Sequence, residues 1–474
     1  MEELIRLYQS YKGTVPEQVT PLPVSASARK YFRMKTGPDS LIGTYSPDIR
    51  ETRAFVSFTA HFRKQGIHVP EVYLVSDDEL FYLQQDLGND LLYDRMKSAR
   101  FDISSDPGLM LLYRKVLAEL VKMQFNGHEG LDYSLCVPRS RFDRQSILWD
   151  LNHFKYYFLK LSGLPFDEDL LEQDFQELAS FLTEQPMEHF MFRDFQSRNI
   201  MIAGEEVFLI DYQGGRRGPL HYDPASLLFE AKTRLSEETR QDLLDDYIVL
   251  ASAHTDIDKE KFTGEFYWWA LIRILQALGA YGLRGTVEKK AVFLQSIPSG
   301  LENLDDIMHH LEGGPSLPEL RRCLAELVRT AAAYPAEPEE WDGVTVSVTS
   351  FSYRKSYPDD LSGNGGGFVF DCRYLANPGI YEQYSDLTGL DPEVEEFFRE
   401  KGDMEPFLDQ VKQQLMPVVH AYLDRGYKHL SVNFGCTGGR HRSVYASTRI
   451  SEFLRTLKNV RVIEIHRELN HMNR

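Results

Sequence analysis

The sequence predicts a bilobal α+β unit followed by a separate α/β layer domain, so that the chain as a whole combines the α+β and α/β classes. Residues 1–88 mix short strand-like runs with one helix, and residues 89–331 have mostly helical periodicity. Beyond a Pro- and Glu-rich stretch at 332–343, strands and helices alternate up to residue 474. Such alternation is typical of an α/β layer domain. We therefore predict two lobes, a linker and a C-terminal domain with these boundaries.

The first lobe is expected to contain a hairpin, a helix and two further strands. The stretch at 21–34 has the small residues and alternation of a hairpin. Phe55, Phe58 and Phe62 recur at helical spacing within 51–66, and strand-like runs follow at 71–75 and 80–88. The second lobe has its clearest helices at 109–124 and 147–161. An island at 190–215 interrupts them with two strand-like runs around a polar loop, where chemistry is expected.

The C-terminal domain is predicted to alternate strands with helices. Strands are expected at 344–353, 367–374, 429–435 and 460–469, and helices at 392–401, 404–425 and 445–457.

Composition excludes several classes of protein. The 474 residues are 42% hydrophobic and 26% charged, which excludes a largely disordered chain. With 53 Lys and Arg against 71 Asp and Glu, the net charge of −18 argues against a polyanion-binding surface over the whole molecule, although a local phosphate pocket remains open. The four cysteines are widely separated and indicate neither a zinc site nor a disulfide framework. Since we find no signal peptide and no apolar run of membrane-spanning length, we predict a cytoplasmic protein without membrane association.

The island at 190–215 carries the groups that phosphoryl transfer from ATP requires. Such a reaction needs a carboxylate that orients and deprotonates the attacking hydroxyl, and oxygen ligands for Mg²⁺. Asp194 and Asn199 have the spacing D-x-x-x-x-N on one loop, and Asp211 follows the strand-like run 207–210. This pattern predicts a kinase that uses ATP and Mg²⁺. The alternative is that these residues only form turns.

The amino-acid sequence around these residues also resembles that of a known family. The segments RDFQSRN (193–199) and LIDYQGGRRGPLHYDPASLL (209–228) closely resemble the aminoglycoside-phosphotransferase family, most of all its sugar-kinase branch that phosphorylates the anomeric hydroxyl of N-acetylmuramate and N-acetylglucosamine. SARKYFR (27–33), GIHVPEVY (66–73) and DLG (86–88) agree, so that the resemblance covers about 1–330. It implies a protein-kinase-like fold and an ATP-dependent phosphotransferase acting on an amino-sugar hydroxyl.

The resemblance also implies roles for individual residues. Asp194 would be the catalytic base, Asn199 and Asp211 the Mg²⁺ ligands, and Asp223 a support of the loop. The remaining candidates are Ser25, Ser27, Arg29 and Lys30 over the phosphates, Gln85 and Leu87 at the hinge beside adenine, and Arg141, Asp143 and Asn152 around the acceptor.

Two departures from that family stand out. Phe192 replaces the loop histidine, so this position can pack behind the loop but cannot donate a hydrogen bond. The strand at 40–47 lacks the phosphate-pairing lysine of most kinases, for which Arg29 or Lys30 would substitute. The competing interpretation is a pseudokinase that serves as a regulatory adapter for an RNA or protein partner.

A second motif lies in HLSVNFGCTGGRHRS (429–443), which has the form strand, glycine-rich turn, helix. Backbone N–H groups of such a turn and the N-terminus of the helix favour an anion, and His441 and Arg442 add side-chain cations. The motif lacks the Lys-[ST] of a nucleotide P-loop, so we expect a phosphate other than that of ATP.

GCTGGRHRSV (435–444), FVFDCRYLANPG (368–379) and LTGLDPEVEEF (387–397) closely resemble the C-terminal domain of the RNase adapter protein RapZ. The resemblance covers 344–470 and implies binding of glucosamine-6-phosphate, contacts with RNA or protein, and a tendency to self-associate. The implied ligand loop consists of Cys436, Thr437, Gly438, Gly439, His441 and Arg442, faced by Arg373 and Asn377. The N-terminal domain of that family is replaced here, and the chain ends HRELNHMNR without a lysine-rich tail, which argues against RNA binding.

The same loop also satisfies another pattern. Cys436 and Arg442 have the C-x5-R spacing of cysteine phosphatases, in which a thiolate and a guanidinium face one phosphate. Alternatively, Cys436 is a small packing residue in a tight turn. We therefore expect an amino-sugar kinase fused to a sugar-phosphate sensing domain, with the phosphatase and the adapter as rivals.

Overall fold

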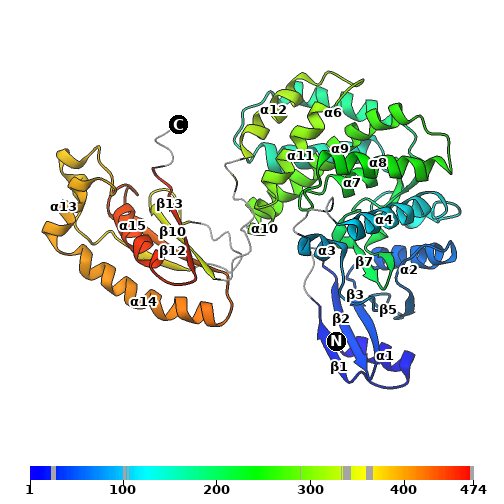
Figure 1. Cartoon of the computed structure of the whole chain (residues 1–474), viewed down its shortest axis with the longest axis horizontal. Helices are drawn as coiled ribbons and strands as arrows, with labels where there is room; N and C mark the ends of the chain where they lie inside the picture. Colours follow the sequence, from blue (N-terminus) through cyan, green and yellow to red (C-terminus); the bar gives the residue numbers. More distant parts are fainter. Residues whose placement is uncertain are drawn as a thin grey trace. The chain divides into compact units, whose positions relative to one another are not determined.

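The computed structural model describes residues 1–22, 28–99, 103, 106–288, 290–331, 334, 343–358 and 367–469. It divides into two compact units, one formed by residues 1–283 and 296–334 and the other by residues 284–295 and 335–474 (Figure 1). Most of the stretch at 332–343, which the sequence predicts to be a linker, lies outside the described residues.

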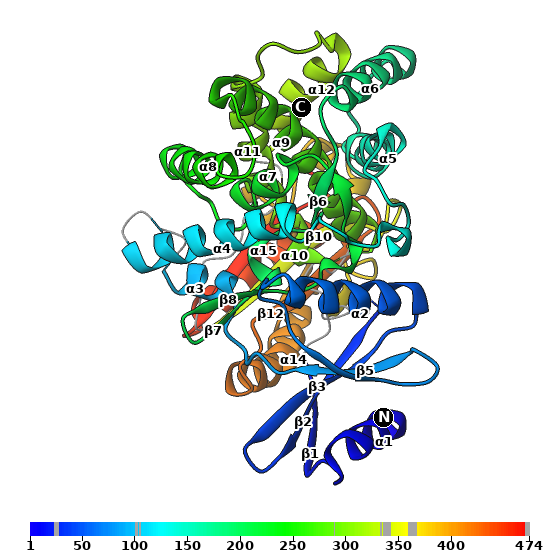
Figure 2. The ribbon, with the colours of Figure 1, turned by 90° about the vertical axis from the view of Figure 1, so that its right-hand side faces the viewer.

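The first part of unit one is built on an antiparallel sheet with the order β1-β2-β3-β5-β4. Its strands are β1 (Gln18–Pro21), β2 (Lys30–Thr36), β3 (Asp39–Tyr45), β4 (Val72–Val75) and β5 (Phe81–Gln85). Helix α1 (Glu2–Lys12) buries Leu4 and Tyr8 against this sheet. Helix α2 (Ile49–Lys64) lies between the sheet and the helical part of the unit (Figure 2). The predicted helix at 51–66 and the strands at 71–75 and 80–88 are confirmed.

The second part of unit one is helical. Its α-helices are α3 (Leu92–Ser98), α4 (Pro107–Phe125), α5 (Arg144–Phe154), α6 (Glu168–Thr183), α7 (Tyr222–Leu228), α8 (Glu237–Ser252), α9 (Lys259–Gly282), α11 (Ile297–His309) and α12 (Pro318–Arg329). Helix α9 is apolar on most of its surface and packs against α5, α7 and α11. The predicted helix at 147–161 is α5 continued by one π-helical turn, Lys155–Leu159.

Short strands interrupt this helical part at the predicted island. Strand β6 (His189–Met191) pairs with β9 (Arg216–Gly218), and β7 (Ile200–Ala203) pairs with β8 (Glu206–Leu209), both antiparallel. The polar segment 192–199 leads from β6 into β7. The two strand-like runs around a polar loop are thereby confirmed.

The second unit contains a parallel sheet with the order β11-β12-β10-β13. Its elements are β10 (Val344–Ser352), β11 (Phe368–Asp371), α13 (Pro392–Lys401), α14 (Met404–Asp424), β12 (His429–Cys436), α15 (Arg442–Arg455) and β13 (Val460–His466), with α10 (Ala291–Leu294) in the same unit. Val346 lies beside Leu430 and Val462 in register, and all three belong to the core that α14 and α15 cover. The predicted α/β layer domain is confirmed, except that α15 begins three residues earlier than expected.

Two predictions from composition can be compared with the structure. All four cysteines lie within the described ranges, and each is a free and buried thiol. Within the same ranges, every helix is too short or too polar to cross a lipid bilayer.

Candidate active site

The segment between β6 and β7 exposes one carboxylate between buried aromatic residues. Asp194 is exposed, whereas Phe192, Phe195 and Asn199 are buried. The Asn199 Nδ2 donates a hydrogen bond of 2.8 Å to the backbone oxygen of Asp194. This bond fixes the turn and leaves the amide oxygen of Asn199 as its ligand atom. Asp194 is therefore accessible to solvent on a fixed turn, as the predicted role of a general base requires.

The β7–β8 hairpin brings Asn199 close to Asp211. Ile200 lies opposite Leu209 in register, and the Ile210 N–H donates to the Asn199 carbonyl at 3.0 Å. Asp211 follows two residues after β8, with a left-handed φ of 74° that aspartate tolerates better than most side chains. The site therefore offers one amide and one carboxylate oxygen, which are hard ligands that suit Mg²⁺. Among the described residues, no group of three or more His, Cys, Asp and Glu forms a complete metal cage, so phosphate and water would have to complete the coordination.

A buried arginine lies between helix α2 and the Asp211 carboxylate. The Arg29 Nη2 donates to Asp211 Oδ1 at 2.5 Å, and its Nε lies 3.8 Å from Glu51 Oε2 on α2. Burial disfavours the charge of Arg29, but the neighbouring Asp211 outweighs it, so the pKa of the guanidinium is raised above its ordinary value. Lys30, the other sequence candidate, is exposed. Of the two sequence candidates, the structure therefore brings Arg29 rather than Lys30 between a glutamate of α2 and Asp211, the predicted Mg²⁺ ligand.

Two carboxylates hold the backbone of the loop on either side of Asp194. Asp223 on α7 is fully buried and accepts N–H bonds from Phe192 at 2.7 Å and Arg193 at 2.9 Å. Seven residues later, Glu230 accepts the Ser197 N–H at 2.7 Å and the Ser197 hydroxyl at 3.0 Å. Because α7 carries or adjoins both carboxylates, one short helix fixes the loop at two points. The supporting contact expected of Asp223 is present, whereas the contact of Glu230 with Ser197 was not predicted from the sequence.

Phe192, which replaces the loop histidine of the family, joins an aromatic cluster. Its ring packs edge-on against Phe195 and Tyr212, with centroid distances of 5.3 and 6.4 Å. Tyr212 in turn stacks on Phe55 of α2 at 5.1 Å. Apolar packing therefore connects residues 192–199, the predicted catalytic segment (called the catalytic segment below), with the Asp211 turn and α2. A histidine at 192 would provide a hydrogen bond at this place.

The glycine-rich loop of the second unit leaves the C-terminal end of β12. The Cys436 Sγ accepts the Gly439 N–H at 3.2 Å and lies 3.1 Å from the Ser443 hydroxyl. Gly439 has φ +70°, and an added Cβ would lie 2.3 Å from the Glu468 side chain, so the turn requires glycine. These contacts fit both a thiol that faces an anion and a packing residue in a tight turn.

The two segments that the sequence expects to form the ligand loop are neighbours. The buried Arg442 guanidinium donates to the carbonyl oxygens of Arg373 at 2.7 Å and Leu375 at 3.2 Å, and approaches the Thr437 hydroxyl at 3.5 Å. The His441 Nε2 lies 3.0 Å from the Tyr384 carbonyl oxygen. Arg442 therefore holds the loop together, while the exposed Arg373 is paired with Asp371 at the surface.

Two protein families match separate parts of the chain. Residues 18–261, which are 244 of the 474, match the family described as the phosphotransferase enzyme family. The chain belongs to the phosphotransferase enzyme family. Residues 344–470 match the RapZ C-terminal domain. Both resemblances and the protein-kinase-like fold class are thereby confirmed, and the protein is a phosphotransferase-family unit joined to a RapZ C-terminal domain.

The curated relatives match about a quarter to a third of this phosphotransferase-family protein. A nucleotide-binding protein of Thermotoga petrophila is 37% identical over 127 residues, which are 27% of this chain and 43% of that protein. A nucleotide-binding protein of Ruegeria pomeroyi is 33% identical over 165 residues, which are 33% of this chain and 55% of that protein. The chain thus spans about half or less of the length of these relatives.

Solved structures resemble about two thirds of the chain at low identity. A choline/ethanolamine kinase family protein from Mesorhizobium loti is 15% identical, with a TM-score of 0.43 over 69% of this chain and 98% of that chain. The ADP-bound aminoglycoside phosphotransferase APH(2'')-Ib is 13% identical, with a TM-score of 0.43 over 69% of this chain and 97% of that chain.

The remaining predicted residues of the phosphotransferase-family unit have contacts within the fold. Gln85 ends β5 and accepts the Glu71 N–H at 3.3 Å through its side chain, and Leu87 is buried. Ser25 and Ser27 lie outside the described residues.

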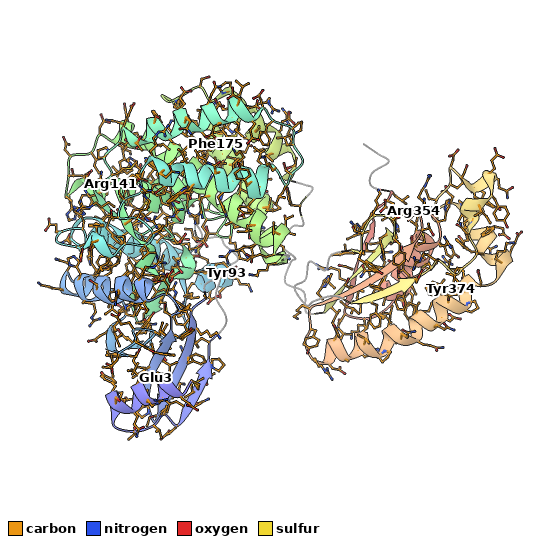
Figure 3. All side chains as sticks on the ribbon, turned by 180° about the vertical axis from the view of Figure 1, so that it is seen from behind. Glu3, Tyr93, Arg141, Phe175, Arg354 and Tyr374 are labelled. Carbon is orange, nitrogen blue, oxygen red and sulfur yellow. The ribbon has the colours of Figure 1, made fainter. Side chains whose placement is uncertain are left out.

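The three acceptor candidates lie on or next to α5. Arg141, on the helical part of the unit (Figure 3), pairs with Glu188 at 3.0 Å. Asp143 caps α5 by accepting the Ser146 N–H, and the Asn152 amide donates back to the Leu148 carbonyl. Their part in acceptor binding stays a prediction.

The pKa of Asp223 leads to a testable dependence of stability on pH. Burial raises this pKa to about 7, against the hydrogen bonds from Phe192 and Arg193 that favour the ionised form. An unfolded aspartate titrates near pH 4, so the folded chain keeps a proton that the unfolded chain has lost, and stability falls as the pH rises to 7. Between pH 5 and pH 8 the wild type should lose about 3 kcal/mol more unfolding free energy than Asp223→Asn.

Urea unfolding at the two pH values, followed by tryptophan fluorescence, measures this difference. Trp149, Trp268 and Trp269 belong to the first unit and report its unfolding. Equal pH dependence in wild type and variant would contradict a raised pKa at Asp223.

Proposed function

We propose that the first unit is an ATP- and Mg²⁺-dependent kinase that phosphorylates a hydroxyl of an amino sugar, at the anomeric position of an N-acetylmuramate or N-acetylglucosamine type of substrate. The observation that carries the proposal is the exposed Asp194 on a loop that Asp223 and Glu230 anchor, beside the oxygen atoms of Asn199 and Asp211. The amino-sugar class is supported by the sequence of 193–199 and 209–228.

In the proposed reaction, Asp194 accepts the proton of the acceptor hydroxyl as its oxygen forms a bond to the γ-phosphorus of ATP. The bond between the γ-phosphorus and the β–γ bridging oxygen breaks, and ADP leaves. Arg29 provides a fixed positive charge for the phosphates. Mg²⁺, when held by Asn199 and Asp211, supplies further neutralisation of the phosphate charge.

The test of this function is ATP consumption with Mg²⁺ and a panel of acceptors. The panel contains N-acetylmuramate, N-acetylglucosamine, glucosamine and an aminoglycoside, with a sample lacking acceptor as the baseline. Turnover above the baseline with one sugar is expected. Retained nucleotide binding without turnover on any acceptor would favour the competing adapter role.

For the second unit we propose binding of an amino-sugar phosphate, with glucosamine-6-phosphate as the first candidate. The proposal is supported by the position of the glycine-rich loop at 437–441 between the end of β12 and the N-terminus of α15, with Arg373 and Asn377 on the segment that Arg442 contacts. This domain would sense a product or a later metabolite of the kinase reaction. The proposal includes an RNA or protein partner for this domain, self-association of the chain and a cytoplasmic location.

Arg373→Ala is expected to abolish the thermal shift that glucosamine-6-phosphate produces. At about 100 times the Kd a ligand adds roughly 3 kcal/mol, or roughly 5–10 °C in the Tm of a domain of this size. Arg373 suits the test because it is exposed, whereas loss of the buried Arg442 would remove contacts inside the fold. Differential scanning fluorimetry measures the effect. The exposed Arg399→Ala, on α13, serves as the control. An undiminished shift in Arg373→Ala would exclude this residue, and no shift with any sugar phosphate would overturn the proposal.

A further inference from the structure

Arg193, the residue before Asp194, has its side chain turned into the protein. Its Nη1 and Nη2 donate to the two carboxylate oxygens of Asp150 at 2.8 and 2.7 Å. The side chain of Arg193 is 16% exposed and that of Asp150 is 10% exposed. A bidentate contact of this kind fixes both the distance and the relative orientation of the guanidinium and the carboxylate. Asp150 is therefore held in one geometry relative to the residue that precedes the base.

The guanidinium of Arg193 is also enclosed by aromatic rings from other elements. Its Cζ lies 4.9 Å from the ring centre of Phe142, just before α5, and 5.5 Å from that of Tyr222 on α7. Arginine stacks readily on aromatic faces, and its planar group cannot be replaced by lysine without losing these contacts. Helices α5 and α7 thus meet at one side chain of the catalytic segment.

The backbone at Arg193 has a strained conformation that directs the side chains of Arg193 and Asp194 to different environments. Its φ of 83° lies in the left-handed region, which costs a residue other than glycine about 1 kcal/mol or more. This conformation leaves the Arg193 side chain mostly buried while Asp194 is exposed. The Arg193 N–H is meanwhile held by Asp223. Side chain and backbone of this residue are therefore fixed from separate helices.

We propose that Asp150 and Arg193 are positioning residues that tie α5 to the catalytic segment, so that the place of α5 sets the place of the Asp194 carboxylate. A buried ion pair adds little net stability compared with apolar residues of similar volume, which makes stability alone a weak reason for this pair. Helix α5 also carries the exposed Trp149 and continues into a π-helical turn with the exposed Tyr156. Turns of this type are frequent at functional sites. An acceptor bound on the α5 side would thereby be aligned with the base.

The inference rests on the proposed kinase function for its kinetic test. Asp150→Asn and Arg193→Gln are each expected to lower kcat by about 10- to 100-fold, because displacement of a reacting group by about 1 Å has effects of this size. The KM for ATP should change by less than about twofold. The double variant should be no slower than the slower single variant, since either change alone breaks the same contact.

A second ion pair, between a buried arginine and a partly exposed aspartate, provides the control. Arg240 of α8 hydrogen-bonds Asp306 of α11, away from the catalytic segment. Asp306→Asn breaks an ion pair of the same kind and should leave kcat unchanged. Equal kcat losses in the two variants, or additive losses in the double variant, would overturn a positioning role.

Hydrogen exchange separates this inference from the proposed function. In full-length Asp150→Asn, the amides of residues 192–199 should exchange at least tenfold faster, with those of α11 unchanged. If the wild type turns over no acceptor, the kinase proposal fails, and faster exchange in the loop alone would still support the tie to α5. Unchanged exchange in the loop would refute the tie whatever the activity.

Discussion

Turnover of ATP with the preferred amino sugar is expected to fall about a thousandfold when Asp194 is replaced by asparagine. General-base catalysis typically contributes 10²- to 10⁴-fold, and an amide of the same shape cannot accept the hydroxyl proton. Because Asp194 is exposed, the change should alter the free energy of unfolding by less than about 0.5 kcal/mol. A coupled assay of ADP release measures the rate, and calorimetry with ADP and Mg²⁺ measures nucleotide binding, which should persist.

The exposed Asp256 offers a matched control, since Asp256→Asn removes a surface carboxylate of the same unit outside the site. Its turnover should equal that of the wild type. Full activity in Asp194→Asn would remove the base assigned here. Loss of nucleotide binding in the same variant would instead indicate a role in holding the nucleotide.

Arg29→Ala is expected to lower kcat/KM for ATP by about 100-fold. Arg29 is the cation that the fold holds between Glu51 and Asp211, and a charge-assisted contact to phosphate in a buried site is worth about 2–3 kcal/mol. Arg29→Lys should recover part of the loss, because it keeps the charge without the planar group. Steady-state kinetics with varied ATP provide the measurement.

Lys30→Ala is the control for this prediction, because Lys30 is adjacent in sequence but exposed on β2. We expect less than a twofold change. The reverse order, with Lys30→Ala the slower variant, would show that Lys30 is the phosphate-pairing residue. Thermal melting of Arg29→Ala must accompany the kinetics, since Asp211 and Glu51 lose a buried partner.

The local sequence was sufficient for the catalytic segment. Asp194 and Asn199 lie on one loop, and the hairpin that follows delivers Asp211, so spacing alone predicts their order and neighbourhood. Most helices and strands were also predictable, because alternation and helical spacing of apolar residues depend only on near neighbours.

Contacts between distant segments were not predictable in this way. Arg29 and Asp211 are 182 positions apart, and nothing in the sequence around Glu51 distinguishes it from other first-turn glutamates of a helix. Glu230 and Asp150 likewise acquire their roles only when α5 and α7 are placed against the loop. The start of α15 was missed because the glycine-rich turn before it resembles an extended loop until His441 and Arg442 are fixed by contacts from other segments.

The aromatic cluster around Phe192 has a consequence for how this site could change during evolution. A histidine introduced at 192 alone would bury ring nitrogens against Phe195 and Tyr212, and an unsatisfied buried polar group costs about 1–3 kcal/mol. Return to the histidine of related kinases would therefore need a partner substitution at Tyr212 or nearby to supply an acceptor. The neighbours of Phe192 pack against its ring, so the single substitution Phe192→His would lower the stability of the protein.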